Sequence, residues 1–110
     1  MFEQLKQVSA LVLNEGDNVA TVLADVAKGA RVMILGRDGR CICQIEAKEV
    51  IPAGHKICVK PVLPGESVVK YGNDIGCAVS GIATGNWVHV HNLASRRGRG
   101  DLAAGKGGCA

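Results

Sequence analysis

Aromatic residues are scarce in this sequence of 110 residues, which contains one Phe, one Tyr and one Trp. Any hydrophobic core must therefore be built mainly from Val, Ile, Leu and Ala side chains. A chain of this length is typical of one small domain with a modest core. Such a domain seldom contains a complete active site with its own deep pocket. The length therefore favours a subunit or a binding module over a self-sufficient enzyme.

Long apolar runs are also missing. No segment has the roughly 20 consecutive apolar residues that cross a bilayer as a helix. The first residues, MFEQLKQ, lack the pattern of a secretory signal. These absences predict a cytoplasmic protein with no membrane partner.

The five cysteines do not suggest a disulfide framework, because their number is odd and they are scattered through apolar segments. This usage is typical of reduced thiols. Cys41 and Cys43 share a face of a predicted strand and could in principle bind a metal ion. No second paired motif accompanies them, so we interpret them as small core or surface residues.

A basic surface for nucleic acid is absent from most of the chain. The formal net charge is +3, and residues 96–110, with four basic residues and one acidic residue, carry the whole excess. The body is neutral, which predicts no nucleic-acid partner. We predict one domain over residues 1–95 and a disordered, basic, glycine-rich tail over residues 96–110.

The N-terminal half predicts short strands and one helix. Val8–Leu13 is expected to be a strand. Apolar residues then recur at the helical positions i, i+3, i+4 and i+7, namely Val19, Val22, Leu23 and Val26. This spacing predicts a short α-helix over residues 18–28 that ends at Gly29. The fold class predicted is therefore mainly β with one short helix.

A hairpin follows the predicted helix. Arg31–Leu35 and Arg40–Ile45 are its predicted strands, and the turn between them contains Gly36 and Gly39. Gly39 is expected at the turn position that requires a positive φ, which glycine adopts without steric cost.

A turn device recurs through the rest of the sequence, in which an apolar residue is followed three positions later by glycine. It occurs at Ile51 to Gly54, Val62 to Gly65 and Ile82 to Gly85, and the same spacing is found at Val26 to Gly29. Pro52 and Pro64 preset the turn at two of these sites. The units fall at unequal intervals, so they do not predict a solenoid.

Trp87–Asn92 is predicted to be a final strand with two histidines on one face. Side chains alternate along a strand, which places His89 and His91 on one side and Val88 and Val90 on the other. Two imidazoles make a candidate metal or anion site, although two are too few for a complete metal shell. The alternative is a polar strand face with two solvated histidines. His55, just after the Gly54 turn, joins them if the fold brings it near, and otherwise it is a turn residue at the start of a strand.

Lys70 and Tyr71 form a second candidate pair. Lysine suits a substrate carboxylate, and tyrosine adds a hydrogen bond or a proton-transfer group. The alternative interpretation is a surface lysine beside a tyrosine that packs its ring on the core.

These residues together resemble a known family. The run VIPAGHKICVKPVLPGESVVKYGNDIGCAVSGIATGNWVHVHNL is similar to the small N-terminal SAF-type domain of the altronate and galactarate dehydratases, and DNVATVLADVAKGARV upstream resembles its opening. The resemblance covers roughly residues 8 to 93. It implies a β-clip fold. Because the chain stops after the module, it resembles the separate small subunit of sulfolactate sulfo-lyase.

The resemblance implies a small subunit of a two-component, metal-dependent lyase that removes water or sulfite from a carboxylic acid and is inactive alone. His89 and His91 are the implied catalytic residues and metal ligands, and Lys70, Tyr71, His55 and Asn92 the implied substrate contacts. The larger catalytic subunit would supply most ligands of a divalent metal, with iron the expected ion. A non-catalytic sugar-acid binding module and an assembly module stay open as alternatives.

Overall fold

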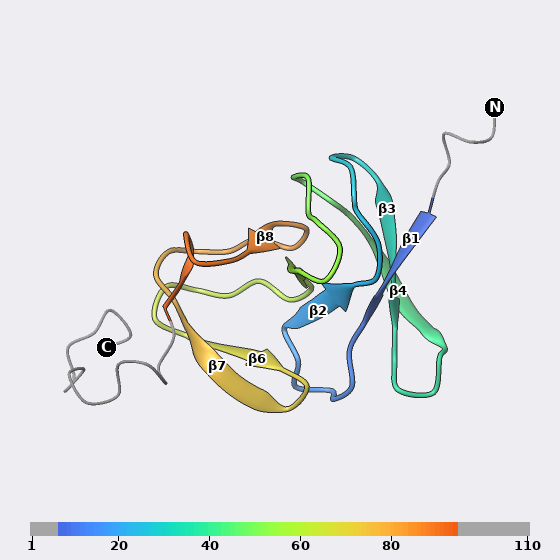
Figure 1. The fold of residues 1–110 in the computed structure, drawn as a ribbon. Coiled ribbons are helices and arrows are strands. Elements are labelled where there is room, and N and C mark those ends of the chain that lie inside the picture. The colour runs from blue at the N-terminus through green and yellow to red at the C-terminus, as the bar shows by residue number, and fades with distance from the viewer. Residues whose placement is uncertain (1–6, 95–110) are drawn as a thin grey trace.

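The chain folds into two sheets of short strands in the computed structural model, which describes residues 7–94 (Figure 1). The strands are β1 (Gln7–Leu11), β2 (Val19–Val22), β3 (Arg31–Leu35), β4 (Cys41–Glu46), β5 (Lys56–Cys58), β6 (Ser67–Lys70), β7 (Asn73–Ala78), β8 (Trp87–Val88) and β9 (Leu93–Ala94). One sheet has the order β4-β3-β1-β2-β5-β8 and the other the order β6-β7-β9. The mainly β class is thus confirmed.

The helix predicted over residues 18–28 is wrong. This segment contains β2, which pairs with β1 and β5, and then Val26, which bridges to Ile51. Val19 lies in one hydrophobic cluster, while Ala20 and Val22 lie in another. A strand covered on both faces shows no alternation, so its apolar residues matched a helical spacing by chance. Residues 7–94 contain no helix that could span a membrane.

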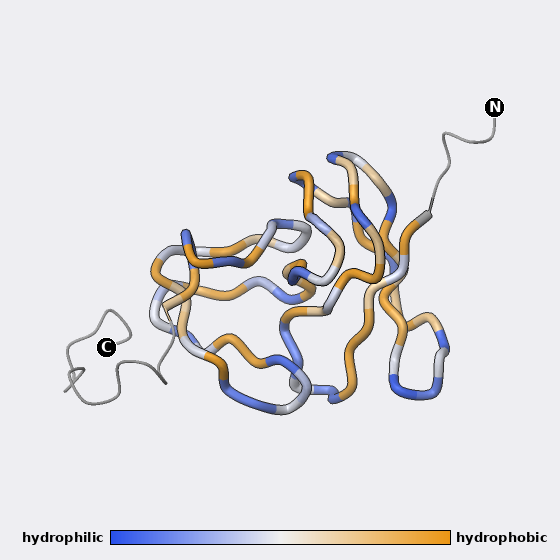
Figure 2. The backbone as a smooth tube through the Cα atoms, viewed as in Figure 1, coloured by the Kyte–Doolittle hydropathy of each residue, from blue (hydrophilic) through white to orange (hydrophobic). Residues whose placement is uncertain are grey.

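The other predicted elements of the N-terminal half are confirmed with small changes in their ends. The first strand is β1, and the hairpin is β3 and β4. Gly39 has a φ of 85° in the turn between them. β1 and β3 run parallel, whereas β3 and β4 run antiparallel. Apolar segments coincide with most of the strands, and hydrophilic segments coincide with the turns, as Figure 2 shows.

The recurring turn device is confirmed at all four sites. Its glycines, Gly29, Gly54, Gly65 and Gly85, have φ values between 84° and 96°. The residue after each glycine donates its N–H to the carbonyl three positions back, at 2.9–3.1 Å. This is the pattern of a type II turn, in which the third residue needs a positive φ.

The four turn units associate in two antiparallel pairs. Val26 bridges to Ile51, and Val62 bridges to Ile82; all four side chains are buried. In each pair, the glycine N–H of one unit donates to a carbonyl four residues before the bridging residue of the other. The fixed spacing between the apolar residue and the glycine therefore results from reciprocal pairing of the turn units and not from a linear repeat.

Two hydrophobic clusters form the core, and β2 and β5 lie between them. Ala20 and Ile57 belong to the cluster of the first strands, while Val19 and Cys58 belong to the cluster around Val62. This core is built from Val, Ile and small residues, as the composition predicts.

The cysteines differ from the expectation at one position. Cys41 and Cys43 are exposed free thiols and Cys58 is a buried one. Cys77 is part of a disulfide, so the prediction of reduced thiols throughout is wrong at this residue. The tail predicted over residues 96–110 lies outside the described residues.

Candidate active site

Three histidines and one tryptophan form the candidate site. His55 ends the turn before β5, and Trp87 lies in β8. These two strands are antiparallel, with Lys56 opposite Val88 and Ile57 opposite Trp87. Extending this register by one residue places His55 opposite His89. Their ring centroids are 5.0 Å apart with planes at 65°.

Trp87 is the shared partner of the three imidazoles. Its ring stacks on His89 at 5.2 Å with an interplanar angle of 9°. His55 meets it edge-on at 5.6 Å and His91 at 5.7 Å. The structure thus brings His55, His89 and His91 together. The sequence predicted this proximity for His89 and His91, and for His55 only if the fold placed it nearby. Trp87 was not predicted as a site residue, although it precedes the histidines in the sequence.

The strand predicted over Trp87–Asn92 is wrong after Val88, where the chain enters a turn. Val88 is buried, whereas Val90 is 79% exposed, so the two valines do not share a buried face. The turn forms because Asn92 and Leu93 donate their N–H groups to the carbonyl of His89. His89 is half-buried and His91 is exposed.

Asn92 holds this turn in place. Its side chain is buried, its Oδ1 accepts the N–H of His89 at 2.9 Å, and its Nδ2 donates to the carbonyl of Trp87 at 2.9 Å. A short amide side chain that bonds nearby backbone groups is a common way to fix a turn. Asn92 therefore positions the histidines, and its contact with a substrate stays a prediction.

Basic groups dominate the electrostatics of the site. Partial desolvation, followed by the positive charges of His55, Lys56 and His91, lowers the pKa of His89. Burial and the neighbouring Lys70 lower the pKa of Lys56. Sequence reasoning missed Lys56, although it follows His55 directly. A concentration of basic groups such as this attracts anions, including carboxylates and sulfonates.

Lys70 and Tyr71 lie at the tip of the hairpin between β6 and β7. Tyr71 has a φ of 52°, and Gly72 follows with 81°. Two positive φ values in a two-residue loop are typical of a type I′ turn. Lys70 Nζ lies 5.2 Å from the centre of the Tyr71 ring. The influence of Lys70 on Lys56 links this hairpin to the histidine cluster.

The described residues provide part of a metal site at most. No group of three His, Cys, Asp or Glu side chains among them is arranged to hold a metal ion. Neutral imidazoles are good ligands for divalent transition metals, and the lowered pKa of His89 favours its neutral form. A complete shell here would need donors beyond the described residues.

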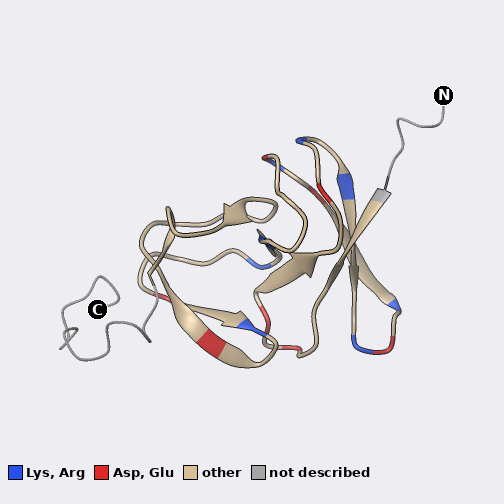
Figure 3. Cartoon of the chain, viewed as in Figure 1, with Lys and Arg blue, Asp and Glu red and all other residues tan. Residues whose placement is uncertain are grey.

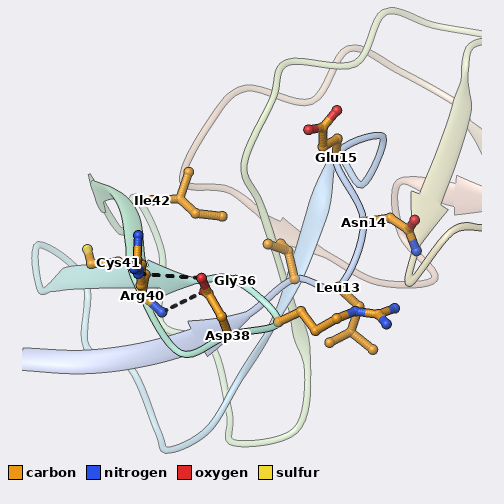
Figure 4. A pocket seen from close by; sticks show the side chains of 10 residues that line it. Leu13, Asn14, Glu15, Gly36, Asp38, Arg40, Cys41 and Ile42 are labelled. Carbon is orange, nitrogen blue, oxygen red and sulfur yellow. Dashed lines mark hydrogen bonds and ion pairs between the residues drawn. The ribbon is translucent and has the colours of Figure 1, made fainter.

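A separate pocket of about 560 Å³ lies between the loop after β1 and the β3–β4 hairpin (Figure 4). Its lining contains no histidine, and it includes the exposed ion pair between Arg40 and Asp38 at 3.5 Å. None of the predicted site residues lies in it.

Comparison with known proteins places the chain in a family. The family model of the altronate/galactarate dehydratase SAF domain matches residues 8–96. The chain belongs to this family, and the resemblance read from the sequence is confirmed.

Individual relatives differ in length. Altronate dehydratase of Bacillus subtilis is 38% identical over 84 residues, which are 76% of this chain and 16% of that protein. The (2R)-sulfolactate sulfo-lyase subunit alpha of Chromohalobacter salexigens is 35% identical over 88 residues, 78% of this chain and 94% of that subunit. The corresponding subunit of Paracoccus pantotrophus is 41% identical over 54 residues, 49% of this chain and 81% of that subunit. The chain thus spans about a sixth of the dehydratase but nearly all of one sulfo-lyase subunit.

Proposed function

We propose that this protein is the small subunit of a two-component lyase that eliminates water or sulfite from a hydroxylated or sulfonated carboxylic acid. The observation that carries the proposal is the cluster of His55, His89 and His91 around Trp87, with Lys56 beside it. The relationship to sulfo-lyase alpha subunits, whose matches cover 94% and 81% of those subunits, supports the subunit role.

Elimination next to a carboxylate defines what the site must supply. A base takes the proton from the α-carbon, the electron pair of that C–H bond forms the new double bond, and hydroxide or sulfite leaves the β-carbon with its own electron pair. Positive charge near the carboxylate stabilises the enolate-like charge that develops. A cluster of imidazoles and lysines contains both kinds of group.

The residues divide naturally into two roles. Lys56 and Lys70 bind the substrate carboxylate, and Tyr71 flanks it from the hairpin tip. His55 packs against His89 to fix its ring. With no metal bound to them, His89 and His91 accept or donate the protons of the elimination. If they instead hold a divalent metal, with iron the expected ion, together with ligands from the larger subunit, the metal would polarise the leaving group and the larger subunit would supply the base.

Reconstitution tests the proposal. The purified chain should show no turnover of altronate, galactarate or (2R)-sulfolactate. Activity should emerge when the chain is mixed with its cognate large subunit, and the large subunit alone should be inactive or strongly impaired. Turnover by the small chain alone would contradict the subunit role.

A titration of the isolated chain with sugar acids distinguishes the proposal from its main alternative. If the chain were a non-catalytic sugar-acid binding module, the isolated protein would bind altronate or galactarate, with shifts of the His55, His89 and His91 NMR signals and no large-subunit requirement. An assembly module would associate with the large subunit without changing its turnover. The proposal requires increased turnover of the mixture.

A further inference from the structure

Two buried side-chain atoms, Thr21 Oγ1 and Trp87 Nε1, have no hydrogen-bond partner in the part of the chain that the structure describes. Thr21 lies opposite Lys56 across the β2–β5 pair. Trp87 lies opposite Ile57 across the β5–β8 pair. Most buried polar groups of folded proteins are hydrogen-bonded, and each exception calls for an explanation. Both exceptions here adjoin the beginning of β5, the strand that leads from the candidate site.

Thr21 is the one polar residue of β2, whose sequence is VATV. Valine has the same shape and an equally branched Cβ, and it suits a strand without adding a hydroxyl. A hydroxyl that is buried without a partner loses its hydrogen bonds to water and gains none in return. The stability of the strand therefore does not account for threonine at this position, whereas a ligand that bonds the hydroxyl does.

Thr21 and Lys56 lie side by side on one face of the sheet. Val22 donates its N–H to the carbonyl of His55 at 2.9 Å, which makes these two residues a hydrogen-bonded pair. Pairs alternate along an antiparallel ladder, so Thr21 and Lys56 form the adjacent non-hydrogen-bonded pair, in which side chains are closest. Cβ atoms of directly opposite residues are about 4.5–5.5 Å apart. One anionic oxygen can therefore bond the hydroxyl and the ammonium group together.

Positive charge at this position is not neutralised by a carboxylate. Neither Lys56 nor Lys70 is in an ion pair within residues 7–94. Lys70 shares a face of β6 with Val68, which is buried in the same hydrophobic cluster as Val19 of β2. Its charge contributes, after desolvation, to the lowered pKa of Lys56. Figure 3 shows the basic tip of β6 and a β2 strand that carries no charge. Ammonium groups and a hydroxyl are donors that suit a carboxylate.

We propose that Thr21 binds the substrate carboxylate together with Lys56, in an anion site that Lys70 completes from the second sheet. The anion site is inferred from these three side chains alone, and its use for the substrate rests on the proposed function. Binding includes a rotation of Thr21, because Oγ1 is buried while other atoms of the residue are exposed. A turn of about 120° about χ1 moves the hydroxyl to the position of the methyl group, another staggered conformation. The rotation breaks no hydrogen bond.

Thermal melts test whether the hydroxyl serves binding or stability. Thr21→Val keeps the shape of the side chain and removes only the unpaired hydroxyl, so it should melt between wild type and about 5 °C above it. Thr84→Val is the matched control. Thr84 is also partly exposed, but its hydroxyl donates to the carbonyl of Val59 at 3.3 Å. This variant should melt about 2–5 °C below wild type.

Titration of the isolated chain with sodium lactate measures the site without the larger subunit. Lactate has a carboxylate next to a hydroxyl-bearing carbon, and sodium chloride at equal ionic strength is the reference. The NMR signals of the Thr21 methyl and the Lys56 ε-methylene should shift with a Kd on the order of 10 mM. Thr21→Val and Lys56→Met should each weaken binding at least about fivefold. Thr21→Ser, which retains a hydroxyl, and Thr84→Val should bind within about twofold of wild type.

Kinetics of the reconstituted complex distinguish the substrate from the larger subunit as the source of the carboxylate. Thr21→Val should raise KM at least about tenfold and leave kcat within about threefold of wild type, and Thr21→Ser should restore KM. If Thr21→Val instead weakens association with the large subunit and leaves KM unchanged, the site binds a carboxylate of that subunit and the proposal is wrong.

Two results with the isolated chain would also overturn the proposal. One is the absence of lactate-dependent shifts at Thr21 and Lys56 up to about 100 mM. The other is a Thr21→Val variant that binds lactate as tightly as wild type. A reconstituted complex without any turnover would contradict the proposed function, and the lactate titration would still decide whether the anion site exists.

Discussion

Asp17 should contribute more to stability than any exposed carboxylate of the domain. Its side chain is 2% exposed. Oδ2 accepts the N–H groups of Leu13 and Asn14 at 3.0 and 3.1 Å, and Oδ1 accepts the N–H of Gly72 at 2.7 Å. The carboxylate thereby ties the loop after β1 to the hairpin that carries Lys70 and Tyr71.

The magnitude follows from the three donors that Asp17→Ala would leave unpaired. A hydrogen bond to a charged group contributes about 1.5–3 kcal/mol. Water can reach part of the site, so we expect a total loss of about 3–5 kcal/mol. That is a large share of the 5–15 kcal/mol typical of a folded domain. Asp17→Asn should lose somewhat less, because one acceptor oxygen remains.

Asp25→Ala is the matched control. Asp25 is exposed and accepts a single backbone N–H, from Ala53 at 2.9 Å. Its loss should cost less than about 1 kcal/mol. Urea unfolding, followed by the fluorescence of the single tryptophan, measures both variants. Equal losses of stability in the two variants would refute the reasoning about Asp17.

Three further predictions concern strain and burial. Tyr71→Asn should raise stability by about 0.5–1 kcal/mol, because Asn tolerates the positive φ of the type I′ turn, whereas Tyr71→Ala should not; thermal melts compare them. Gly85→Ala should cost over about 3 kcal/mol in urea, since its Cβ would overlap the carbonyl oxygen of Glu46. Gly29→Ala, with open space around it, should cost about 1–2 kcal/mol. Burial raises the pKa of Cys58 to about 11, so the folded state holds this proton longer than the unfolded state. The Cys58 contribution to stability should therefore decline as pH rises from 9 to 11, and native Cys58 should resist iodoacetamide at pH 8 while Cys41 reacts.

Local turn chemistry could be predicted from the sequence, because it depends on residues close together in the chain. The four glycine turns and the positive φ of Gly39 are examples, since glycine has a steric advantage there whatever the surroundings. The error at residues 18–28 has the opposite origin. β2 becomes a strand because β1 and β5 bind it on both sides, and a hydrophobic spacing contains no information about those distant partners.

In the candidate site, too, local features could be predicted from the sequence and features that depend on distant partners could not. The sequence identified His55, His89 and His91, but it assumed that a strand continued to Asn92. The turn after Val88 depends on the buried amide of Asn92, which bonds the backbone on both sides. The pairing of His55 with His89 depends on the register of β5 and β8. Lys56 joins the site only through that register. Trp87 precedes His89 by two residues and so shares the face of the two histidines in the predicted strand, a signal that could have identified it.

Activity of histidine variants in the reconstituted complex tests the central claim most directly. His89→Ala and His91→Ala should each lower kcat at least about a hundredfold, as expected for groups that stabilise developing charge or transfer protons. Val90→Ala is the control, because this side chain lies in the same turn and is 79% exposed. All three variants should bind the large subunit and melt within about 3 °C of wild type. Wild-type turnover in both histidine variants would contradict the account and assign the cluster a structural role.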